Sequence, residues 1–207
     1  GNYIRYSETL AKSIVNEHGV LWANQFDNLS NKKSHYLTTG PEIYKQLSQK
    51  VDAFICSIGT GGTISGVSDF LKEKNKNIVI GLADPMGSAM HNFYKNGQLK
   101  STGSSITEGI GQGRITRNLE NTVIDESFQI TDTEALNIVY EMVRKEGLIL
   151  GGSSGVNIMG AVKLGKLIGP NKKIVTILCD YGTKYESKIF NKKFLKDKEP
   201  VSYTHLR

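Results

Sequence analysis

A short segment rich in glycine and threonine, Gly59–Thr63, has the residue types and the position of an anion-binding loop. It lies between an apolar run that predicts a buried strand, Val51–Ile58, and a stretch whose apolar residues recur at helical spacing. A loop that opens a helix presents several backbone N–H groups and the positive end of the helix dipole to one anion. The hydroxyls of Thr60 and Thr63 can add donors, and glycine lets the backbone approach a ligand closely.

The spacing within this loop excludes the two common nucleotide-binding signatures. No Gly-Lys-Ser/Thr follows it, as a Walker loop requires, and Ile64 stands where a dinucleotide motif has its third glycine. What remains is a grip for a single phosphate, such as the phosphate of a phosphorylated cofactor. For the loop taken alone, a tight strand-to-helix turn with no ligand is an equally good interpretation.

The elements around the loop predict an α/β fold, with a parallel sheet covered by helices on both faces. Thr131 and Glu134 form a capping box at the start of the clearest helix, Asp132–Glu146. Residues 25–40 are expected to be a polar loop. The other expected helices are 7–17, 41–48, a stretch after residue 62, 86–96 and a stretch that ends at 169–170; the expected strands are 20–24, 51–58, 78–83, 123–130, 148–150 and 174–178.

Composition and charge argue against several classes of partner. The net charge is +6, but the lysines are spread along the chain, and no face combines arginine with aromatic residues as nucleic-acid binders do. No apolar run reaches the length of a membrane span. Cys56 lies in a predicted strand and Cys179 at the end of one, which indicates buried thiols in a reducing compartment, so we expect a cytoplasmic protein. We expect no metal site.

Six motifs in a fixed order carry a resemblance to a known family. They are Gln25–Asn28, Thr38–Ile43, Gly59–Thr63, Glu108–Gly111, Gly152–Gly155 and Asp180–Tyr185. In this order they resemble the second half of cysteine synthase (O-acetylserine sulfhydrylase), in the β-family of pyridoxal-phosphate enzymes. The resemblance extends over roughly residues 2–194. It implies pyridoxal 5'-phosphate (PLP) as the cofactor and the parallel-sheet PLP fold type II, similar to the tryptophan synthase β chain, with the N-terminal part missing.

The resemblance also implies roles for individual residues. Gln25 matches a glutamine near the cofactor and the bound amino acid, although an amide that ties a loop is the alternative. Ser153 and Ser154 open a helix, where an N-cap role is as good an interpretation as ligand contact. The implied phosphate cradle is Gly59, Thr60, Gly61, Gly62 and Thr63, and the implied mouth of the active site is Gly109, Ile110 and Gly111.

Asp180 matches the position of the group that faces the cofactor's ring nitrogen. Better-known family members carry serine there, so this is a departure. A carboxylate near that nitrogen would favour a protonated ring and a stronger electron sink. Cys179 is the alternative partner if the alignment shifts by one residue, and an Asp that caps a helix after a strand is the structural alternative.

The family's Schiff-base lysine lies in an N-terminal motif, and none of the lysines of this sequence has a matching context. The Ser/Thr-Gly-Asn loop that holds the substrate carboxylate is also missing. We therefore expect a fragment of a longer enzyme, with no catalytic lysine and no turnover alone. The expected division is a large phosphate-binding domain over residues 1–195 and a peripheral tail over residues 196–207. The last residues of the tail continue no pattern, which is compatible with a foreign end.

The activity that the resemblance implies is β-replacement, in which L-cysteine is made from O-acetyl-L-serine and sulfide. Cystathionine β-synthase or another β-replacement enzyme of the same family is a second interpretation. A non-catalytic module that binds phosphate or a protein partner is a third. A homodimer and a complex with serine acetyltransferase are implied for the full enzyme.

Overall fold

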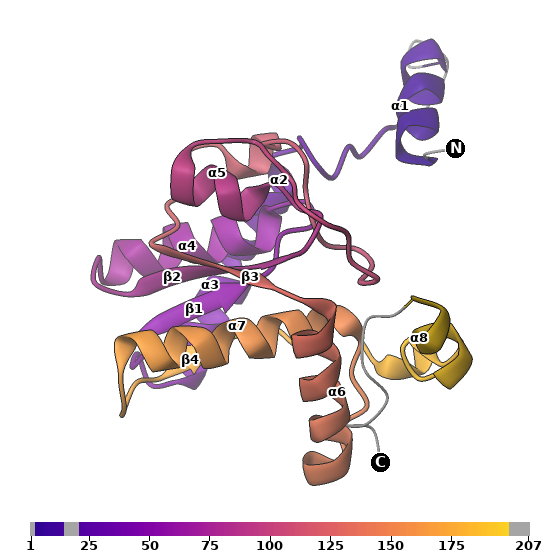
Figure 1. Cartoon of the computed structure of the whole chain (residues 1–207). Coiled ribbons are helices and arrows are strands. Elements are labelled where there is room, and N and C mark those ends of the chain that lie inside the picture. Colours follow the sequence, from indigo (N-terminus) through magenta and orange to yellow (C-terminus); the bar gives the residue numbers. More distant parts are fainter. Residues whose placement is uncertain (1–2, 15–20, 199–207) are drawn as a thin grey trace.

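Four parallel strands form the sheet on which the rest of the chain is built, in a computed structural model that describes residues 3–14 and 21–198 (Figure 1). The strands lie in the order β3-β2-β1-β4. Ala53 of β1 is opposite Val79 of β2 and Ile174 of β4, and Gly81 of β2 is opposite Glu126 of β3. The strand bounds are Ala53–Cys56 (β1), Val79–Pro85 (β2), Glu126–Ile130 (β3) and Ile174–Val175 (β4).

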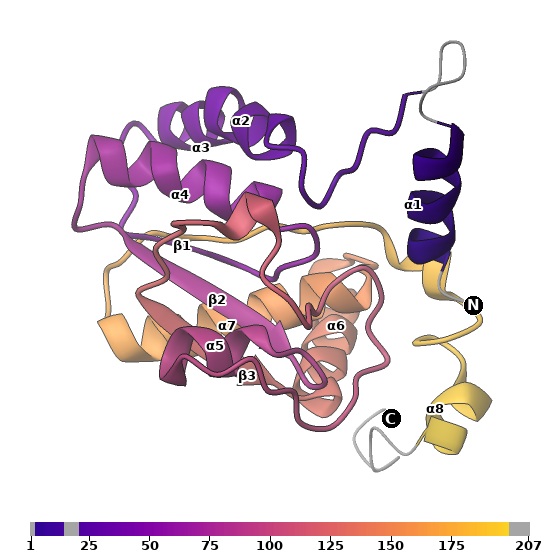
Figure 2. The same ribbon diagram turned by 90° about the horizontal axis from the view of Figure 1, so that it is seen from above.

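Helices cover both faces of this sheet, as Figures 1 and 2 show. One face packs against α4 and α5, with α3 and α2 beyond α4, and the other packs against α7 and α6. The helix bounds are Tyr3–Ile14 (α1), Ser30–Leu37 (α2), Thr39–Gln46 (α3), Gly62–Lys74 (α4), Met90–Asn96 (α5), Asp132–Glu146 (α6), Gly152–Ile168 (α7) and Lys192–Lys198 (α8), with 3-10 turns at Arg117–Leu119 (η1) and Gly182–Tyr185 (η2).

Strand β1 is buried on both sides, because alternate side chains of a strand point to opposite faces. Phe54 and Cys56 lie in the core beneath α4 and α5, whereas Ala53 and Ile55 lie in the core beneath α7. Such two-sided burial is typical of parallel sheets with helices on both faces. The predicted fold class is therefore confirmed at the level of its layers.

Two predictions for the N-terminal region are wrong. Residues 21–24 form no strand, because they lie in a segment with no neighbouring strand and Leu21 is 90% exposed; residue 20 lies outside the described residues. The predicted polar loop 25–40 contains all of α2 and the start of α3. Tertiary packing stabilises this polar helix: a Cβ on Gly66 of α4 would lie 2.3 Å from the carbonyl oxygen of Lys32, so glycine lets α2 contact α4 closely.

Other predicted elements exist with shorter or shifted bounds. The strand predicted over 174–178 is limited to Ile174–Val175, and the one predicted over 148–150 is a single bridge between Leu150 and Tyr181. The helix predicted over 7–17 is α1, of which residues 15–17 lie outside the described residues. Helix α8 runs across residues 195–196, and residues 199–207 are not described, so the proposed domain division stays a prediction.

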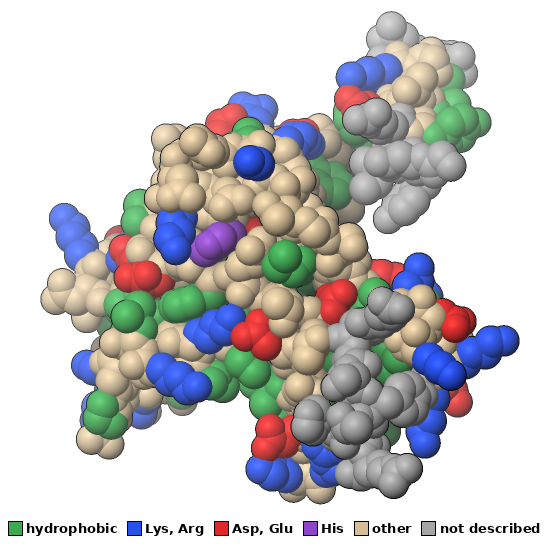
Figure 3. Space-filling view, in the orientation of Figure 1, with side chains coloured by type: hydrophobic (Ala, Val, Ile, Leu, Met, Phe, Trp, Pro, Cys, Tyr) green, Lys and Arg blue, Asp and Glu red, His purple; other side chains and the backbone are tan. Residues whose placement is uncertain are grey.

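The structure adds to what composition indicated about partners. On the face shown in Figure 3, Lys and Arg side chains are scattered among acidic ones instead of forming one stripe. None of the described helices combines the length and the hydropathy that crossing a bilayer requires. In the described ranges, no three His, Cys, Asp or Glu side chains are grouped so that they could hold a metal ion.

The capping box of α6 allows the contribution of the Thr131 side chain to stability to be tested. The Thr131 Oγ1 accepts from the backbone N–H of Glu134 at 3.3 Å, and the Glu134 Oε2 accepts from the backbone N–H of Thr131 at 2.9 Å. We expect Thr131→Ala to lower the free energy of unfolding by about 1 kcal/mol, measured by urea denaturation. Thr102→Ala, in an exposed loop, is the control and should have no measurable effect. Equal stability of Thr131→Ala and the parent would contradict the assignment.

Candidate active site

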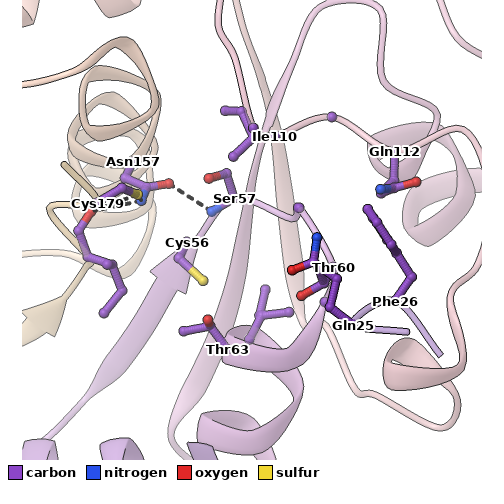
Figure 4. Close-up of a pocket in the computed structure, with 16 residues that line it drawn as sticks. Gln25, Phe26, Cys56, Ser57, Thr60, Thr63, Ile110, Gln112, Asn157 and Cys179 are labelled. Atoms are coloured by element: carbon purple, nitrogen blue, oxygen red, sulfur yellow. Dashed lines mark hydrogen bonds between the residues drawn. The ribbon is translucent and has the colours of Figure 1, made fainter. Parts of the chain in front are cut away.

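A cavity of about 490 Å³ opens at the carboxyl end of β1 (Figure 4). Five parts of the chain enclose it: the turn between β1 and α4, the loop before η1, the segment before α2, helix α7, and the chain that follows β4. Clefts at the carboxyl ends of parallel strands are the usual place for ligands in open α/β sheets. The lining residues are Gln25, Phe26, Cys56, Ser57, Gly59, Thr60, Gly61, Thr63, Ile64, Gly109, Ile110, Gly111, Gln112, Asn157, Ile177 and Cys179.

The turn Gly59–Thr63 forms one wall of the cavity and leads directly into α4. Gly61 has φ +88°, a left-handed conformation that favours glycine, and a Cβ there would lie 2.5 Å from Cγ of Leu119. A Cβ on Gly59 would lie 2.5 Å from the carbonyl oxygen of Gly109. Four of the five predicted cradle residues line the cavity; Gly62 is next to it, at the first position of α4.

The two threonine hydroxyls of this turn have defined partners. Asn31 Nδ2 donates to Thr60 Oγ1 at 2.9 Å, and Thr63 Oγ1 lies 3.2 Å from Nε2 of His35. The other ring nitrogen of His35, Nδ1, lies 2.9 Å from Oγ1 of Thr39. Burial lowers the pKa of His35, so the ring is neutral at neutral pH and its tautomer decides which hydroxyl donates.

The predicted rim residues lie beside the start of this turn. Gly109 and Gly111 both have positive φ, at +77° and +89°, and the Gly111 N–H donates to the carbonyl oxygen of Ile58 at 2.9 Å. That bond joins the rim to the end of β1. Gly109, Ile110 and Gly111 all line the cavity, so the structure brings the predicted mouth and the predicted cradle together.

Gln25 lies at the same cavity, on a segment that is fixed by its backbone. The buried Asn118 donates through Nδ2 to the carbonyl oxygens of Gln25 and Phe26, at 2.9 and 2.7 Å. Nearby, Arg114 forms two bonds with Asp27, at 3.0 and 2.8 Å. The hydrogen bond from Arg114 is the largest cause that lowers the pKa of Asp27. The side chain of Gln25 stays exposed, free to turn toward a ligand.

Asn157 is a site residue that the sequence reasoning missed. Its Oδ1 accepts from the backbone N–H of Ser57 at 2.7 Å, and its Nδ2 donates to the carbonyl oxygen of Ile177 at 2.8 Å, with Sγ of Cys179 at 3.4 Å (Figure 4). The side chain is fully buried. It thus joins the end of β1 to the chain after β4. The available signal was an amide residue between the apolar residues Val156 and Ile158 of α7.

Asp180 does not line the cavity, whereas its neighbour Cys179 does. The Asp180 Oδ2 accepts from the Tyr185 hydroxyl at 2.8 Å and lies 3.5 Å from Nζ of Lys184, and its Oδ1 is buried without a partner among the described residues. Cys179 is exposed as a residue, but partial desolvation of its sulfur raises the pKa of the thiol, which is therefore neutral at neutral pH.

The two predicted serines lie behind this segment and not at the N-cap of α7. The N-cap is Gly151, with no side-chain cap bond, so the N-cap interpretation of Ser153 and Ser154 is wrong. Ser154 Oγ accepts from the backbone N–H of Cys179 at 2.9 Å and is fully buried. Its role is to hold the chain that carries Cys179.

The residues present fit a phosphorylated aromatic cofactor in size and polarity. One wall offers the hydroxyls of Thr60 and Thr63 and the amino end of α4, which suits an anion. The opposite side is less polar and includes Ile110 and Ile177. The volume is that of an ordinary small-molecule site. In the described part of the chain, no lysine lines this cavity.

This combination of a parallel sheet and a phosphate-type cavity has a counterpart among known proteins. The sequence profile of the family described as pyridoxal-phosphate dependent enzyme matches residues 1–180. The chain therefore belongs to this family, and PLP is the cofactor of the family. The predicted family and cofactor are confirmed.

Individual relatives make the relationship more specific. The chain is 43% identical to "Cysteine synthase 1" of Neurospora crassa over 202 residues, which cover 95% of this chain and 53% of the relative. It is 42% identical to "Cysteine synthase 1" of Emericella nidulans over 202 residues, with 95% and 54% covered. The chain spans about half the length of the curated relatives it matches.

A solved structure shares the fold. The crystal structure of O-acetylserine dependent cystathionine β-synthase from Helicobacter pylori matches with a TM-score of 0.80 and 31% identity, covering 89% of this chain and 57% of that one. The predicted PLP fold type II is thereby confirmed.

We expect Asn157→Leu to lower the free energy of unfolding by about 2 to 4 kcal/mol, because the N–H of Ser57 and the carbonyl of Ile177 lose their partner. Asn157→Asp keeps an acceptor for Ser57 and loses the donor to Ile177. Asn96→Leu, on the exposed end of α5, is the matched control. Urea denaturation of the variants is the measurement, and equal stability of Asn157→Leu and Asn96→Leu would refute the bridging role.

Asp84, at the carboxyl end of β2, predicts how the stability of the protein changes with pH. Burial raises its pKa to about 6, and Oδ2 accepts from the backbone N–H of His91 at 2.7 Å. Between the unfolded pKa of about 4 and the folded value, the native state binds the extra proton, so stability falls as pH rises. About two pH units at 1.4 kcal/mol each give a loss of about 3 kcal/mol.

The Asp84→Asn variant has no titratable carboxyl group at this position and is the control. Subtracting its unfolding free energies from those of the parent, measured from pH 4 to pH 7, cancels the contributions of the other carboxyl groups. We expect the difference to fall through this window and to become constant above it. Two parallel curves would show that Asp84 titrates normally in the folded protein.

Proposed function

We propose that this chain forms the phosphate-holding part of a PLP-dependent β-replacement active site that makes L-cysteine from O-acetyl-L-serine and sulfide. The observation that carries the proposal is the shared cavity, which joins the turn Gly59–Thr63 to Gln25 and to the rim Gly109–Gly111. These segments are far apart in the sequence, and a ligand in the cavity would contact all three.

At one end of the cavity, the phosphate of the cofactor is held by Gly59, Thr60, Gly61, Gly62 and Thr63. The amino end of α4 supplies backbone N–H groups and the positive end of the helix dipole. The glycines keep side chains out of the space that the phosphate occupies. In this role the two threonine hydroxyls act as donors to phosphate oxygens.

At the mouth of the cavity, Gln25 and the rim contact the amino-acid substrate. The amide of Gln25 has both donors and an acceptor, and it is exposed on a fixed backbone, so it can turn to meet a carboxylate or an ester oxygen. Gly109 and Gly111 leave room for the substrate, and Ile110 limits access of water beside it.

We assign Cys179, and not Asp180, as the residue that faces the ring nitrogen of the cofactor, because of the two only Cys179 lines the cavity. A neutral thiol does not promote protonation of the ring, whereas the carboxylate of Asp180 is engaged with Tyr185 outside the cavity wall. Asn157 holds the Cys179 segment against β1. Asp180 therefore keeps only a structural part in the proposal.

When bound, PLP supplies the electron sink that delocalises the charge left by loss of the substrate α-proton. Since no lysine lines the cavity in the described residues, we propose that this chain alone holds PLP without a covalent bond and does not catalyse turnover. Its own residues bind the phosphate, orient the ring and shape the mouth of the site.

The names of the relatives support the substrates. Two of them are named cysteine synthase, and the crystal structure from Helicobacter pylori is of a protein described as O-acetylserine dependent. That same description as a cystathionine β-synthase supports the alternative, in which the second substrate is a larger thiol. Sulfide and homocysteine, offered in turn to a full-length enzyme that contains this chain, distinguish the two.

The proposal extends to partners and location. A homodimer and a complex with serine acetyltransferase follow from the proposed cysteine synthase role and are tested by sedimentation of the full-length enzyme with and without the acetyltransferase. Cys56 and Cys179 are both free, which supports a reducing compartment such as the cytoplasm. A non-catalytic module would keep phosphate binding but show no selectivity for PLP over other phosphates.

Titration of the chain with PLP, followed by absorbance, tests the proposed binding. We expect saturable binding and weaker binding of pyridoxal, which lacks the phosphate. We also expect a loss of PLP affinity of about tenfold or more in Gly61→Ala, because a Cβ there would clash with Leu119 and displace the turn that lines the cavity. Gly97→Ala is the matched control: Gly97 also has positive φ, at +70°, but nothing lies within 4 Å of its Cβ position. Circular dichroism checks that both variants fold.

Two outcomes would contradict the proposal. Equal affinities for PLP and pyridoxal would show that the phosphate does not contribute to binding. Equal losses of PLP affinity in Gly61→Ala and Gly97→Ala would show that the loss comes from backbone strain and not from a change in the cavity. The absence of a covalent link is checked separately. After borohydride reduction with PLP we expect no lysine to be labelled in preference to the exposed ones, and with O-acetyl-L-serine and sulfide no L-cysteine above the rate without protein.

A further inference from the structure

Asn31, near the start of α2, faces the turn Gly59–Thr63 from outside the cavity. One of its amide atoms lies 2.8 Å from the carbonyl oxygen of Gln25. Because a carbonyl oxygen can only accept, that amide atom is the nitrogen Nδ2. The same nitrogen lies 2.9 Å from Oγ1 of Thr60, so both of its hydrogens are used.

This geometry fixes the direction of the Thr60 hydroxyl. An amide nitrogen has no lone pair to offer, so Thr60 Oγ1 is the acceptor of the bond from Asn31. The backbone N–H of Gly62 also points at this oxygen, at 3.4 Å. The one hydroxyl hydrogen of Thr60 is left over, and within residues 3–14 and 21–198 no hydrogen bond donated by this hydroxyl is present.

The close approach of Asn31 has its own structural requirement. A Cβ on Gly62 would lie 1.9 Å from Oδ1 of Asn31, so no side chain is possible at this position while Asn31 keeps its place. On the other side of the turn, Thr116 Oγ1 donates to the carbonyl oxygen of Thr60 at 2.8 Å. Thr60 is thus held at its hydroxyl by Asn31 and at its backbone carbonyl by Thr116, and it lines the cavity.

We propose that Asn31 is a positioning residue that turns the Thr60 hydroxyl hydrogen into the cavity, where it donates to a phosphate oxygen. Through its second bond, Asn31 couples this donor to the Gln25 backbone, and so the phosphate end of the site to the substrate end. The inference rests on the proposed function for the identity of the ligand. A purely loop-tying asparagine would need only the bond to Gln25.

Inorganic phosphate is the probe, because it tests the donor independently of PLP. Its binding is followed by ¹H–¹⁵N NMR shifts of the Gly61, Gly62 and Thr63 amides. In Asn31→Asp, an oxygen replaces Nδ2 and takes the Thr60 hydrogen for itself. We expect the phosphate dissociation constant to rise by about tenfold to a hundredfold, the range for a lost hydrogen bond to a charged group.

The added negative charge of Asn31→Asp requires two controls. Asn28→Asp places the same charge on the same segment, at an exposed side chain, and should change the constant less than about threefold. In the Thr60→Val background there is no hydroxyl to orient. There we expect Asn31→Asp to weaken phosphate binding by no more than Asn28→Asp does, so the two effects are strongly non-additive.

The outcomes separate this inference from the proposed function. Phosphate binding by the parent, with no binding of PLP, would refute the proposed function and leave the role of Asn31 in place. Unchanged phosphate affinity in Asn31→Asp, or an equal loss with Val at position 60, would refute the inference even if PLP binds. A parent chain that fails to bind phosphate refutes both.

Discussion

Three segments approach the turn after β1 more closely than any side chain would allow, and the site depends on this constraint. Gly59 admits the carbonyl of Gly109 on the rim, Gly61 admits Leu119 of η1, and Gly62 admits the amide of Asn31. Each approach fixes a different side of the turn. Because a Cβ at Gly59, Gly61 or Gly62 would meet a different neighbour in each case, the run of glycines is already required by packing, apart from any role in binding a ligand.

Buried or half-buried amide side chains then fix the segments that the glycines admit. Asn118 holds the backbone of residues 25–26, Asn31 joins that backbone to Thr60, and Asn157 joins the end of β1 to the chain after β4. An amide both donates and accepts, so one side chain can satisfy two backbones without adding charge. The neutral ring of His35 belongs to the same system, because it contacts Thr63 without placing a fixed cation there.

The resulting site is polar at one end and nearly free of formal charge. In the proposed site, the hydroxyls of Thr60 and Thr63 and the amino end of α4 would face the phosphate, whereas the opposite wall carries Cys179 as a neutral thiol. Such an arrangement holds a phosphate by oriented dipoles, which act strongly where water is partly excluded. The phosphate end of the site does not determine the reaction, which depends on the groups that contact the ring and the substrate.

The sequence by itself determined the parallel α/β layers, the helix Asp132–Glu146 with its cap, and the glycine turn, because these depend on periodicity and local backbone preferences. It also indicated the family, through motifs whose order is fixed. Only the tertiary structure decided that residues 30–37 are a helix, that Cys179 and not Asp180 lines the cavity, and that Asn31 and Asn157 are bridges. Those features depend on contacts between residues far apart in the chain, which local sequence patterns do not predict.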